Sequence, residues 1–170
     1  MNFDEWKQLA EEGAAEAQYN LALMYSLGKE IAKDDQVAIK WYRLAAEQGF
    51  AEAQTNLGLM YGKGQGVEQN FSEAVKCYRL AAEQGLAQAQ HNLGVMYRQG
   101  KGVQKNLFEA FWWFKRAAEQ GYGQAEYNLG LMCSRGEGVA KDYKEAVKWY
   151  RLSAEQRILG AQSNLGLMYE

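Results

Sequence analysis

Proline is absent from this sequence of 170 residues, and cysteine and histidine are scarce, with two cysteines and one histidine. Glycine is abundant instead, at 18 residues, which is typical of helices that end at glycine and not at proline. Cys77 and Cys133 are too few for a disulfide framework. No histidine and cysteine cluster has the spacing of a zinc site, and no nucleophile motif is present. We therefore expect no metal, no cofactor and no catalysis.

A large charge of either sign is missing as well. Nineteen basic and 21 acidic residues give a formal net charge of −2, which favours neither nucleic acid nor an anionic membrane as a partner. No apolar run approaches the roughly 20 residues that a membrane-spanning helix needs, so we expect no membrane insertion. The first residues, MNFDEWKQLAEEG, lack the basic start and apolar stretch of a secretory signal. We expect a cytoplasmic protein, and a periplasmic or secreted one if a signal peptide has been removed.

What the sequence has in quantity is internal repetition. A block that begins AQYNLALMY at residue 17 recurs every 36 residues, at 53, 89, 125 and 161. Its apolar residues stand at helical spacing, so each copy predicts an amphipathic helix, called helix A below. A glycine interrupts four of the copies, at Gly58, Gly94, Gly130 and Gly166, and Ala22 stands there in the first. Because glycine weakens a helix, we expect the backbone of a neighbouring helix to approach closely at this position.

A second block, AIKWYRLAAEQG at residue 38, recurs at 74, 110 and 146 and predicts helix B. Residues suited to the N-cap precede it, and glutamates three residues later make a pattern like a capping box. These are Asp34, Asn70, Asn106 and Asp142, followed by Glu73, Glu109 and Glu145. Gly49, Gly85 and Gly121 stand where a left-handed residue ends a helix. Arg157 replaces that glycine in the last copy, which predicts a different turn there.

We expect one repeat domain over residues 1–170, because a single helix pair cannot bury its apolar face and stacked neighbours supply the core. Its predicted parts are a lone helix B at 1–12, repeats at 13–48, 49–84, 85–120 and 121–156, and helix A of an incomplete fifth repeat at 157–170. That last helix carries Leu165, Leu167 and Met168 with no helix B after it. Either self-association covers this face, or the chain is a fragment of a longer array.

The consensus AEAQxNLGxMY…GxGVxxDYxEAxxWYRxAAEQG resembles the Sel-one-like repeat (SLR) family, a relative of the tetratricopeptide repeat, over essentially the whole chain. The resemblance implies an all-α fold, a right-handed α–α superhelix (solenoid) of 36-residue helix–turn–helix repeats. It also implies an adaptor or scaffold with a protein or peptide ligand, as in bacterial members that act in host interaction and signalling. Some bacterial relatives carry a disulfide in each repeat and are linked to β-lactam binding. A cell-wall or β-lactam-related binding protein or hydrolase is therefore the alternative function.

One asparagine in each helix A is the first candidate for ligand binding: Asn20, Asn56, Asn92, Asn128 and Asn164. In the related tetratricopeptide fold, an asparagine at this place faces the concave groove and contacts bound peptide, so the resemblance implies the same here. Alternatively, each asparagine bonds a neighbouring helix and holds the stack together. Residues of the same helix face that vary between copies are further candidates: Tyr19, Thr55, His91, Tyr127 and Ser163, then Glu16, Glu52, Gln88 and Gln124, then Leu23, Leu59, Val95 and Leu131.

Aromatic residues give two more expectations. Tyr19 and Tyr127 are plausible anchors for a ligand, because aromatic side chains are enriched at binding hot spots. Residues 111–114 are all aromatic, and a helix cannot bury four consecutive side chains on one face. Trp112 replaces a lysine of the other copies, so we predict that it is exposed on the convex side.

Overall fold

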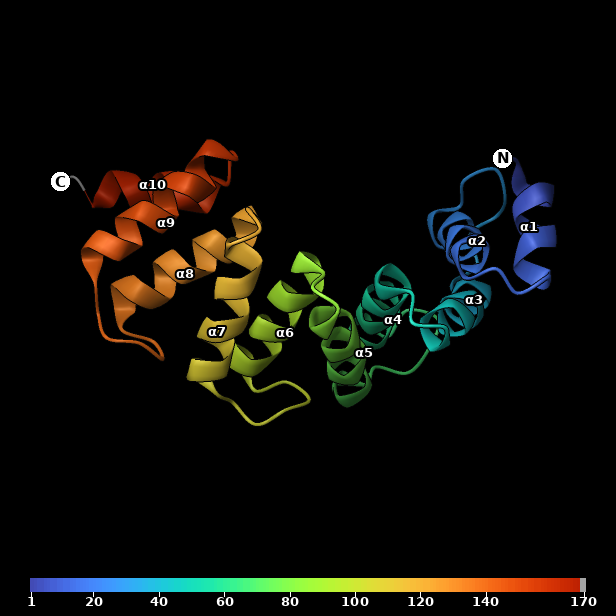
Figure 1. Cartoon of the computed structure of the whole chain (residues 1–170), viewed down its shortest axis with the longest axis horizontal. Helices are drawn as coiled ribbons and strands as arrows, with labels where there is room; N and C mark the ends of the chain where they lie inside the picture. The colour runs from blue at the N-terminus through green and yellow to red at the C-terminus, as the bar shows by residue number, and fades with distance from the viewer. Residues whose placement is uncertain (169–170) are drawn as a thin grey trace. The chain divides into compact units, whose positions relative to one another are not determined.

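The computed structural model describes residues 1–168, which form ten α-helices and no strand (Figure 1). The first five are α1 (Phe3–Glu11), α2 (Ala15–Leu27), α3 (Asp35–Glu47), α4 (Ala51–Lys63) and α5 (Phe71–Glu83). The other five are α6 (Ala87–Gln99), α7 (Leu107–Ala118), α8 (Gly123–Arg135), α9 (Tyr143–Glu155) and α10 (Leu159–Leu167). Even-numbered helices are the predicted A helices and odd-numbered ones the B helices. The all-α solenoid class is confirmed. The predicted end of the last helix, Tyr169 and Glu170, lies outside the described residues.

The helices divide into two compact units, Met1–Leu86 with α1 to α5 and a second unit from Ala87 onward with α6 to α10. Within each unit, every helix packs against the helix that follows it. In the first unit, Ala38, Tyr42 and Leu57 belong to one buried cluster, and Ala10 and Leu21 belong to another beneath α1. In the second unit, the buried cluster includes Leu131, Cys133, Ala146, Tyr150 and Ala161.

The predicted helix ends are largely confirmed. The side chains of Asp34, Asn70, Asn106 and Asp142 each accept a backbone N–H in the first turn of their B helix. A reciprocal capping box forms at α1 between Asn2 and Glu5. Glu73 and Glu145 instead pair with Lys76 and Lys148, at 2.6 and 2.8 Å. Gly49, Gly85 and Gly121, after α3, α5 and α7, have the predicted left-handed φ, between 78 and 97°.

The prediction of a different turn at Arg157 is wrong. Arg157 adopts φ 63°, in the same left-handed region as the glycines it replaces. Its N–H donates to Ala154 O at 2.9 Å, and the N–H of Ile158 donates to Ser153 O at 3.3 Å. Gly49 and Phe50 make the equivalent two bonds, so the turn is kept despite the change of residue.

The prediction that a helix backbone lies against the mid-helix glycines is only partly right. A Cβ added at Gly58, Gly94 or Gly130 would lie 2.5 to 2.8 Å from an aromatic ring, that of Tyr78, Phe114 or Tyr150. Each ring belongs to the B helix of the same repeat. Close approach is therefore confirmed, but a side-chain ring, and not chiefly a helix backbone, fills the space. At Gly166 an added Cβ would meet no atom of residues 1–168 within 4 Å.

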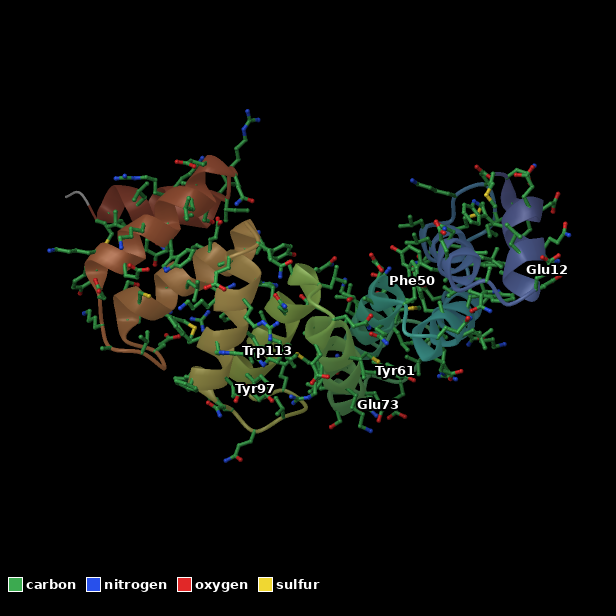
Figure 2. The ribbon with its side chains drawn as sticks, viewed as in Figure 1. Glu12, Phe50, Tyr61, Glu73, Tyr97 and Trp113 are labelled. Carbon is green, nitrogen blue, oxygen red and sulfur yellow. The ribbon has the colours of Figure 1, made fainter. Side chains whose placement is uncertain are left out.

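The exposure predicted for Trp112 is confirmed. Its side chain is 42% exposed, and the guanidinium of Arg116 lies 4.8 Å from the centroid of its ring. The neighbouring Trp113, labelled in Figure 2, is buried. Across residues 1–168, no helix is both long and apolar enough to cross a membrane.

Candidate functional site

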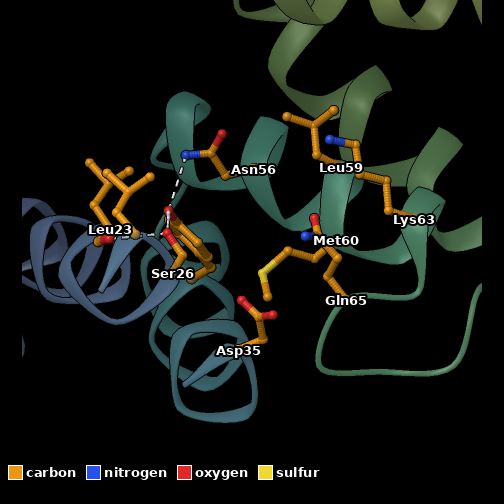
Figure 3. Close-up of a pocket in the computed structure, with 10 residues that line it drawn as sticks. Leu23, Ser26, Asp35, Asn56, Leu59, Met60, Lys63 and Gln65 are labelled. Atoms are coloured by element: carbon orange, nitrogen blue, oxygen red, sulfur yellow. Dashed lines mark hydrogen bonds between the residues drawn. The ribbon is translucent and has the colours of Figure 1, made fainter. Parts of the chain in front are cut away.

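A pocket in the first unit lies between the A helices α2 and α4, beside the start of α3 (Figure 3). It has a volume of about 240 Å³ and is lined by Leu23, Ser26, Leu27, Asp35, Tyr42, Asn56, Leu59, Met60, Lys63 and Gln65. We call it the leucine slot, because three of these residues are leucines. Three of the predicted candidates, Leu23, Asn56 and Leu59, line it.

The floor of the leucine slot is a polar link between three helices. The buried hydroxyl of Tyr42, from α3, lies 3.4 Å from Ser26 Oγ on α2 and accepts a bond of 3.3 Å from Asn56 Nδ2 on α4. Burial raises the pKa of Tyr42, so this hydroxyl stays protonated and uncharged at neutral pH. The floor can therefore exchange hydrogen bonds with a ligand but carries no charge of its own.

The wall and rim of the leucine slot have a different character. Leu23 and Leu59 are half-buried, and Leu27 is 58% exposed. Asp35 and Lys63 bring one charge of each sign. The arrangement suits an apolar side chain that enters from a peptide whose backbone polar groups remain at the rim.

The same floor recurs in the second unit. Tyr150 Oη lies 3.2 Å from Ser134 Oγ, and Asn164 lines the same pocket as this pair. Burial raises the pKa of Tyr150, and the hydrogen bond with Ser134 acts in the opposite direction. A pocket of about 160 Å³ lies above this floor, with Leu131, Arg135 and Leu167 in its lining.

The third repeat departs from this pattern at two positions. Phe114 replaces the tyrosine, and Arg98 replaces the serine. Asn128, the asparagine of this repeat's slot, therefore bonds Arg98 and not a tyrosine: Arg98 Nη1 donates to Asn128 Oδ1 at 3.1 Å. Asn128 Nδ2 donates to Gln124 O at 2.9 Å and lies 3.1 Å from His91 Nε2, which then acts as an acceptor. His91 lies against the rings of Phe114 and Tyr122, and burial lowers its pKa.

The five predicted asparagines have different surroundings. Asn56 donates to the buried Tyr42 and Asn164 lies in the same pocket lining as Tyr150, whereas Asn20 Nδ2 donates to Glu16 O of its own helix at 2.9 Å. Asn128 is held by Arg98 and His91. Asn92 Nδ2 is buried and has no hydrogen-bond partner within the described residues.

The flanking candidates are only partly accessible. Thr55 is 1% exposed and its hydroxyl donates to Ala51 O at 2.9 Å, so it has no surface for a ligand and leaves the candidate site. Tyr19 is half-buried and its ring lies 5.0 Å from that of Phe50, labelled in Figure 2. Tyr127 packs on Tyr150, at 6.1 Å between centroids. The exposed members of the set are Glu16, Glu52, Gln88, Gln124 and Ser163.

Sequence reasoning missed a set of glutamines that join successive helices. A glutamine at the end of each complete repeat donates to a buried side chain 30 residues earlier, over 2.8 to 2.9 Å. The pairs are Gln48–Gln18, Gln84–Gln54, Gln120–Gln90 and Gln156–Glu126. Two of these buried residues also donate to the preceding B helix, Gln18 Nε2 to Ala10 O at 3.2 Å and Gln54 Nε2 to Ala46 O at 3.1 Å. Their strict recurrence in the repeat was the available signal. They stabilise the scaffold and do not line the slots.

Comparison with known proteins places this geometry among related chains. The family model described as Sel1 repeat matches residues 15–50, 51–86, 87–122 and 123–157. The structure of c5321, a protective antigen of uropathogenic Escherichia coli with an SLR fold, is 44% identical with a TM-score of 0.96. A Sel1 repeat protein from Oxalobacter formigenes is also 44% identical, with a TM-score of 0.86. The immunity protein PA5088 from Pseudomonas aeruginosa is 27% identical, with a TM-score of 0.58.

These matches cover nearly all of this chain but a smaller share of each matched protein. They cover 99%, 93% and 91% of this chain, in the same order. The chain spans 36% of the length of c5321, 65% of the Oxalobacter protein and 56% of the immunity protein. No curated protein matches the sequence.

Proposed function

The chain belongs to the Sel1 repeat family, whose members are generally protein-interaction modules, and from this premise we propose that it is a non-catalytic adaptor. Its ligand is a peptide or protein segment held along the face of the A helices. The observation that carries the proposal is the leucine slot, with its polar floor and exposed apolar rim. The resemblance to an immunity protein supports a protein as the partner.

Magnitudes indicate which residues supply the affinity. A neutral hydrogen bond contributes about 0.5–1.5 kcal/mol, whereas association costs on the order of 4–15 kcal/mol. The asparagines therefore orient a ligand, and apolar burial must hold it. Burying a leucine or phenylalanine side chain contributes about 1.5–3 kcal/mol. Leu23, Leu27 and Leu59 provide such a surface in one slot.

The binding role is favoured over a cell-wall or β-lactam-related protein by the state of the cysteines. The alternative was drawn from relatives with a disulfide in each repeat. Here Cys77 and Cys133 are free thiols, each buried within its own unit. Burial raises the pKa of each to about 11, so neither is a thiolate nucleophile at neutral pH.

A display experiment tests the proposal. A library of random dodecapeptides is panned against the whole chain, and enriched peptides are measured by fluorescence anisotropy. We expect an apolar residue common to the enriched peptides. We also expect Leu27→Glu to weaken their binding by at least about tenfold, since each 1.4 kcal/mol is a factor of ten.

The matched control is Leu44→Glu on α3. Leu44 is 43% exposed and does not line the slot, so this variant adds the same charge to a similar surface residue. Affinity should then match that of the unaltered chain. Absence of any enriched peptide, or equal losses in the two variants, would contradict the proposal.

A further inference from the structure

Arg98 is the residue by which the third repeat differs most from the others on the slot face. Ser26, Gly62 and Ser134 stand at this position in the other repeats. The guanidinium is held by two groups of the second unit. Its Nε and Nη2 each lie 3.0 Å from Glu137 Oε2, and its Nη1 donates to Asn128 Oδ1 at 3.1 Å. The side chains of Arg98 and Glu137 are 22% and 26% exposed, so solvent and a ligand can reach the pair.

A cavity of about 370 Å³ adjoins this pair. It is lined by Arg98, Gln99, Lys105, Leu107 and Glu137, and we call it the arginine slot. Positive charge is in excess here. Arg98 and Lys105 line the slot, and Arg135 Nη1 lies 3.6 Å from Glu137 Oε1. Glu137 is the single carboxylate among these residues and leaves the three cations incompletely neutralised.

We propose that the arginine slot binds a side-chain carboxylate of an acidic peptide, and that Glu137 occupies the guanidinium of Arg98 until the ligand arrives. This deepens the proposed adaptor role and rests on it. Arginine presents a planar fork that matches a carboxylate in bidentate geometry. Glu137 uses only one oxygen toward that fork. A ligand carboxylate can engage it with both oxygens.

The guanidinium is positioned before the ligand binds. Asn128 Oδ1 accepts from Nη1 on the side away from Glu137, while Asn128 Nδ2 is fixed by Gln124 O and His91 Nε2. Glu137 lies in the segment between α8 and α9, so its side chain can turn away without disturbing a helix. A preorganised cation with a displaceable internal partner is thus available for exchange.

A pair of labelled peptides tests the proposal. Both carry fluorescein at the N-terminus and an amide at the C-terminus, with the sequences Gly-Leu-Glu-Gly-Leu-Glu-Gly and Gly-Leu-Gln-Gly-Leu-Gln-Gly. In 50 mM NaCl we expect the glutamate peptide to bind the whole chain at least about fivefold more tightly. The gap should narrow in 500 mM NaCl, because salt screens partly exposed charges.

Three variants separate the arginine slot from general charge effects. Glu137→Gln removes the internal competitor and should tighten binding of the glutamate peptide several-fold. Arg98→Ser combined with Phe114→Tyr introduces the serine–tyrosine–asparagine link of the first repeat, so we expect the double variant to fold and to lose the preference for glutamate. Lys115→Gln removes an exposed charge of α7 outside the slot and should leave the preference unchanged.

Equal binding of the two peptides, or no binding of either, would overturn the proposal, and so would weaker binding by Glu137→Gln. A third peptide, the glutamine sequence with a free C-terminal carboxylate, tests the other source of this group. If it binds as tightly as the glutamate peptide, a chain terminus and not a side chain is the ligand, and the assignment is wrong. Display-selected peptides that depend on Leu27 but ignore Arg98 would leave the adaptor role standing and remove only this inference.

Discussion

The mid-helix glycines show at single residues how one repeat solves a packing problem. Gly58, Gly94 and Gly130 admit the ring of an aromatic residue on the paired B helix. The first repeat has Ala22 there, fully buried, so the ring and the helix can shift enough to admit one methyl group. Sequence alone predicted close approach at these glycines. It could not identify the neighbour, because which side chain fills a gap depends on how the two helices are paired.

Gly130→Ala and Gly166→Ala should therefore change stability in opposite directions. At Gly130 the new Cβ would lie 2.5 Å from Tyr150 Cδ1, and overpacking of this kind costs about 1–3 kcal/mol. At Gly166, in α10, an added Cβ would meet nothing within 4 Å among the described residues, and alanine should gain up to about 1 kcal/mol of helix propensity. Urea denaturation followed by circular dichroism measures both. Equal effects of the two substitutions would refute the packing explanation.

Arg157 marks a limit of prediction from residue type. A glycine adopts the left-handed conformation without the steric cost that other residues pay, so the conformations of Gly49, Gly85 and Gly121 were predicted from sequence. Arg157 adopts the same conformation although its residue type disfavours it. Two backbone hydrogen bonds hold it there, from Arg157 N to Ala154 O and from Ile158 N to Ser153 O. Such a constraint comes from the rest of the turn and is invisible in the identity of one residue.

At the scale of helices, the stack depends on polar links as well as apolar stripes. The helices and their N-caps were predicted because periodicity and cap residues act locally. The glutamine links were not, because a glutamine at helical spacing looks like a surface residue until the adjoining helices bury it. The residues that line the slots were hard to predict for the same reason. Asn56 was among the candidates, but its partner Tyr42 and the exposed Leu27 were not.

Glu126 tests the glutamine links, because it occupies the place of Gln18, Gln54 and Gln90. Burial raises its pKa above 4.5, and the nearby Glu155 adds to this effect. Folding thus favours its protonated form, and that stabilisation is lost as pH rises through the folded-state pKa. Glu126→Gln should stabilise the protein at pH 7, on the order of 1 kcal/mol. The gain should shrink as pH falls through the raised folded-state pKa toward 4.5 and change little below that pH.

Thermal denaturation of the two proteins between pH 4 and 8 measures this difference. The control is Glu155→Gln, an exposed change that removes the neighbouring charge but keeps the buried carboxyl group. It should recover only part of the gain. A benefit of Glu126→Gln that does not vary with pH would point to shape and not to charge.

For the whole molecule, the unbroken 36-residue repeat predicts the helical scaffold but not how the slots differ from one repeat to the next. The leucine slot and the arginine slot occupy equivalent places in the repeat, yet leucines form the wall of the first and charged side chains form most of the second. The differences rest on substitutions such as Ser26 against Arg98. Their consequences could not be predicted from sequence, because Arg98 acquires its role only where Asn128 and Glu137 from the next repeat meet it.

The buried His91 of the third repeat should make the stability of the whole molecule depend on pH in the acidic range. Burial lowers its pKa below 6.5, so the stabilisation by its neutral form is present above pH 6.5 and is lost as pH falls through the lower folded-state pKa. Protonation also opposes the bond from Asn128 Nδ2, since Nε2 could no longer accept. His91→Gln keeps an acceptor that does not titrate. We expect its Tm to fall less than that of the unaltered chain between pH 7.5 and 5.

This prediction concerns how steeply Tm changes with pH and not the value of Tm at any one pH. Loss of the imidazole removes ring contacts with Phe114 and Tyr122 and should lower the Tm of the variant at every pH. Glu126 acts in the opposite direction, because its protonation on acidification stabilises the fold. A double variant with Glu126→Gln should therefore lose this compensating gain and fall more steeply than His91→Gln alone. Parallel curves for the unaltered chain and His91→Gln would show that the imidazole does not titrate with unfolding.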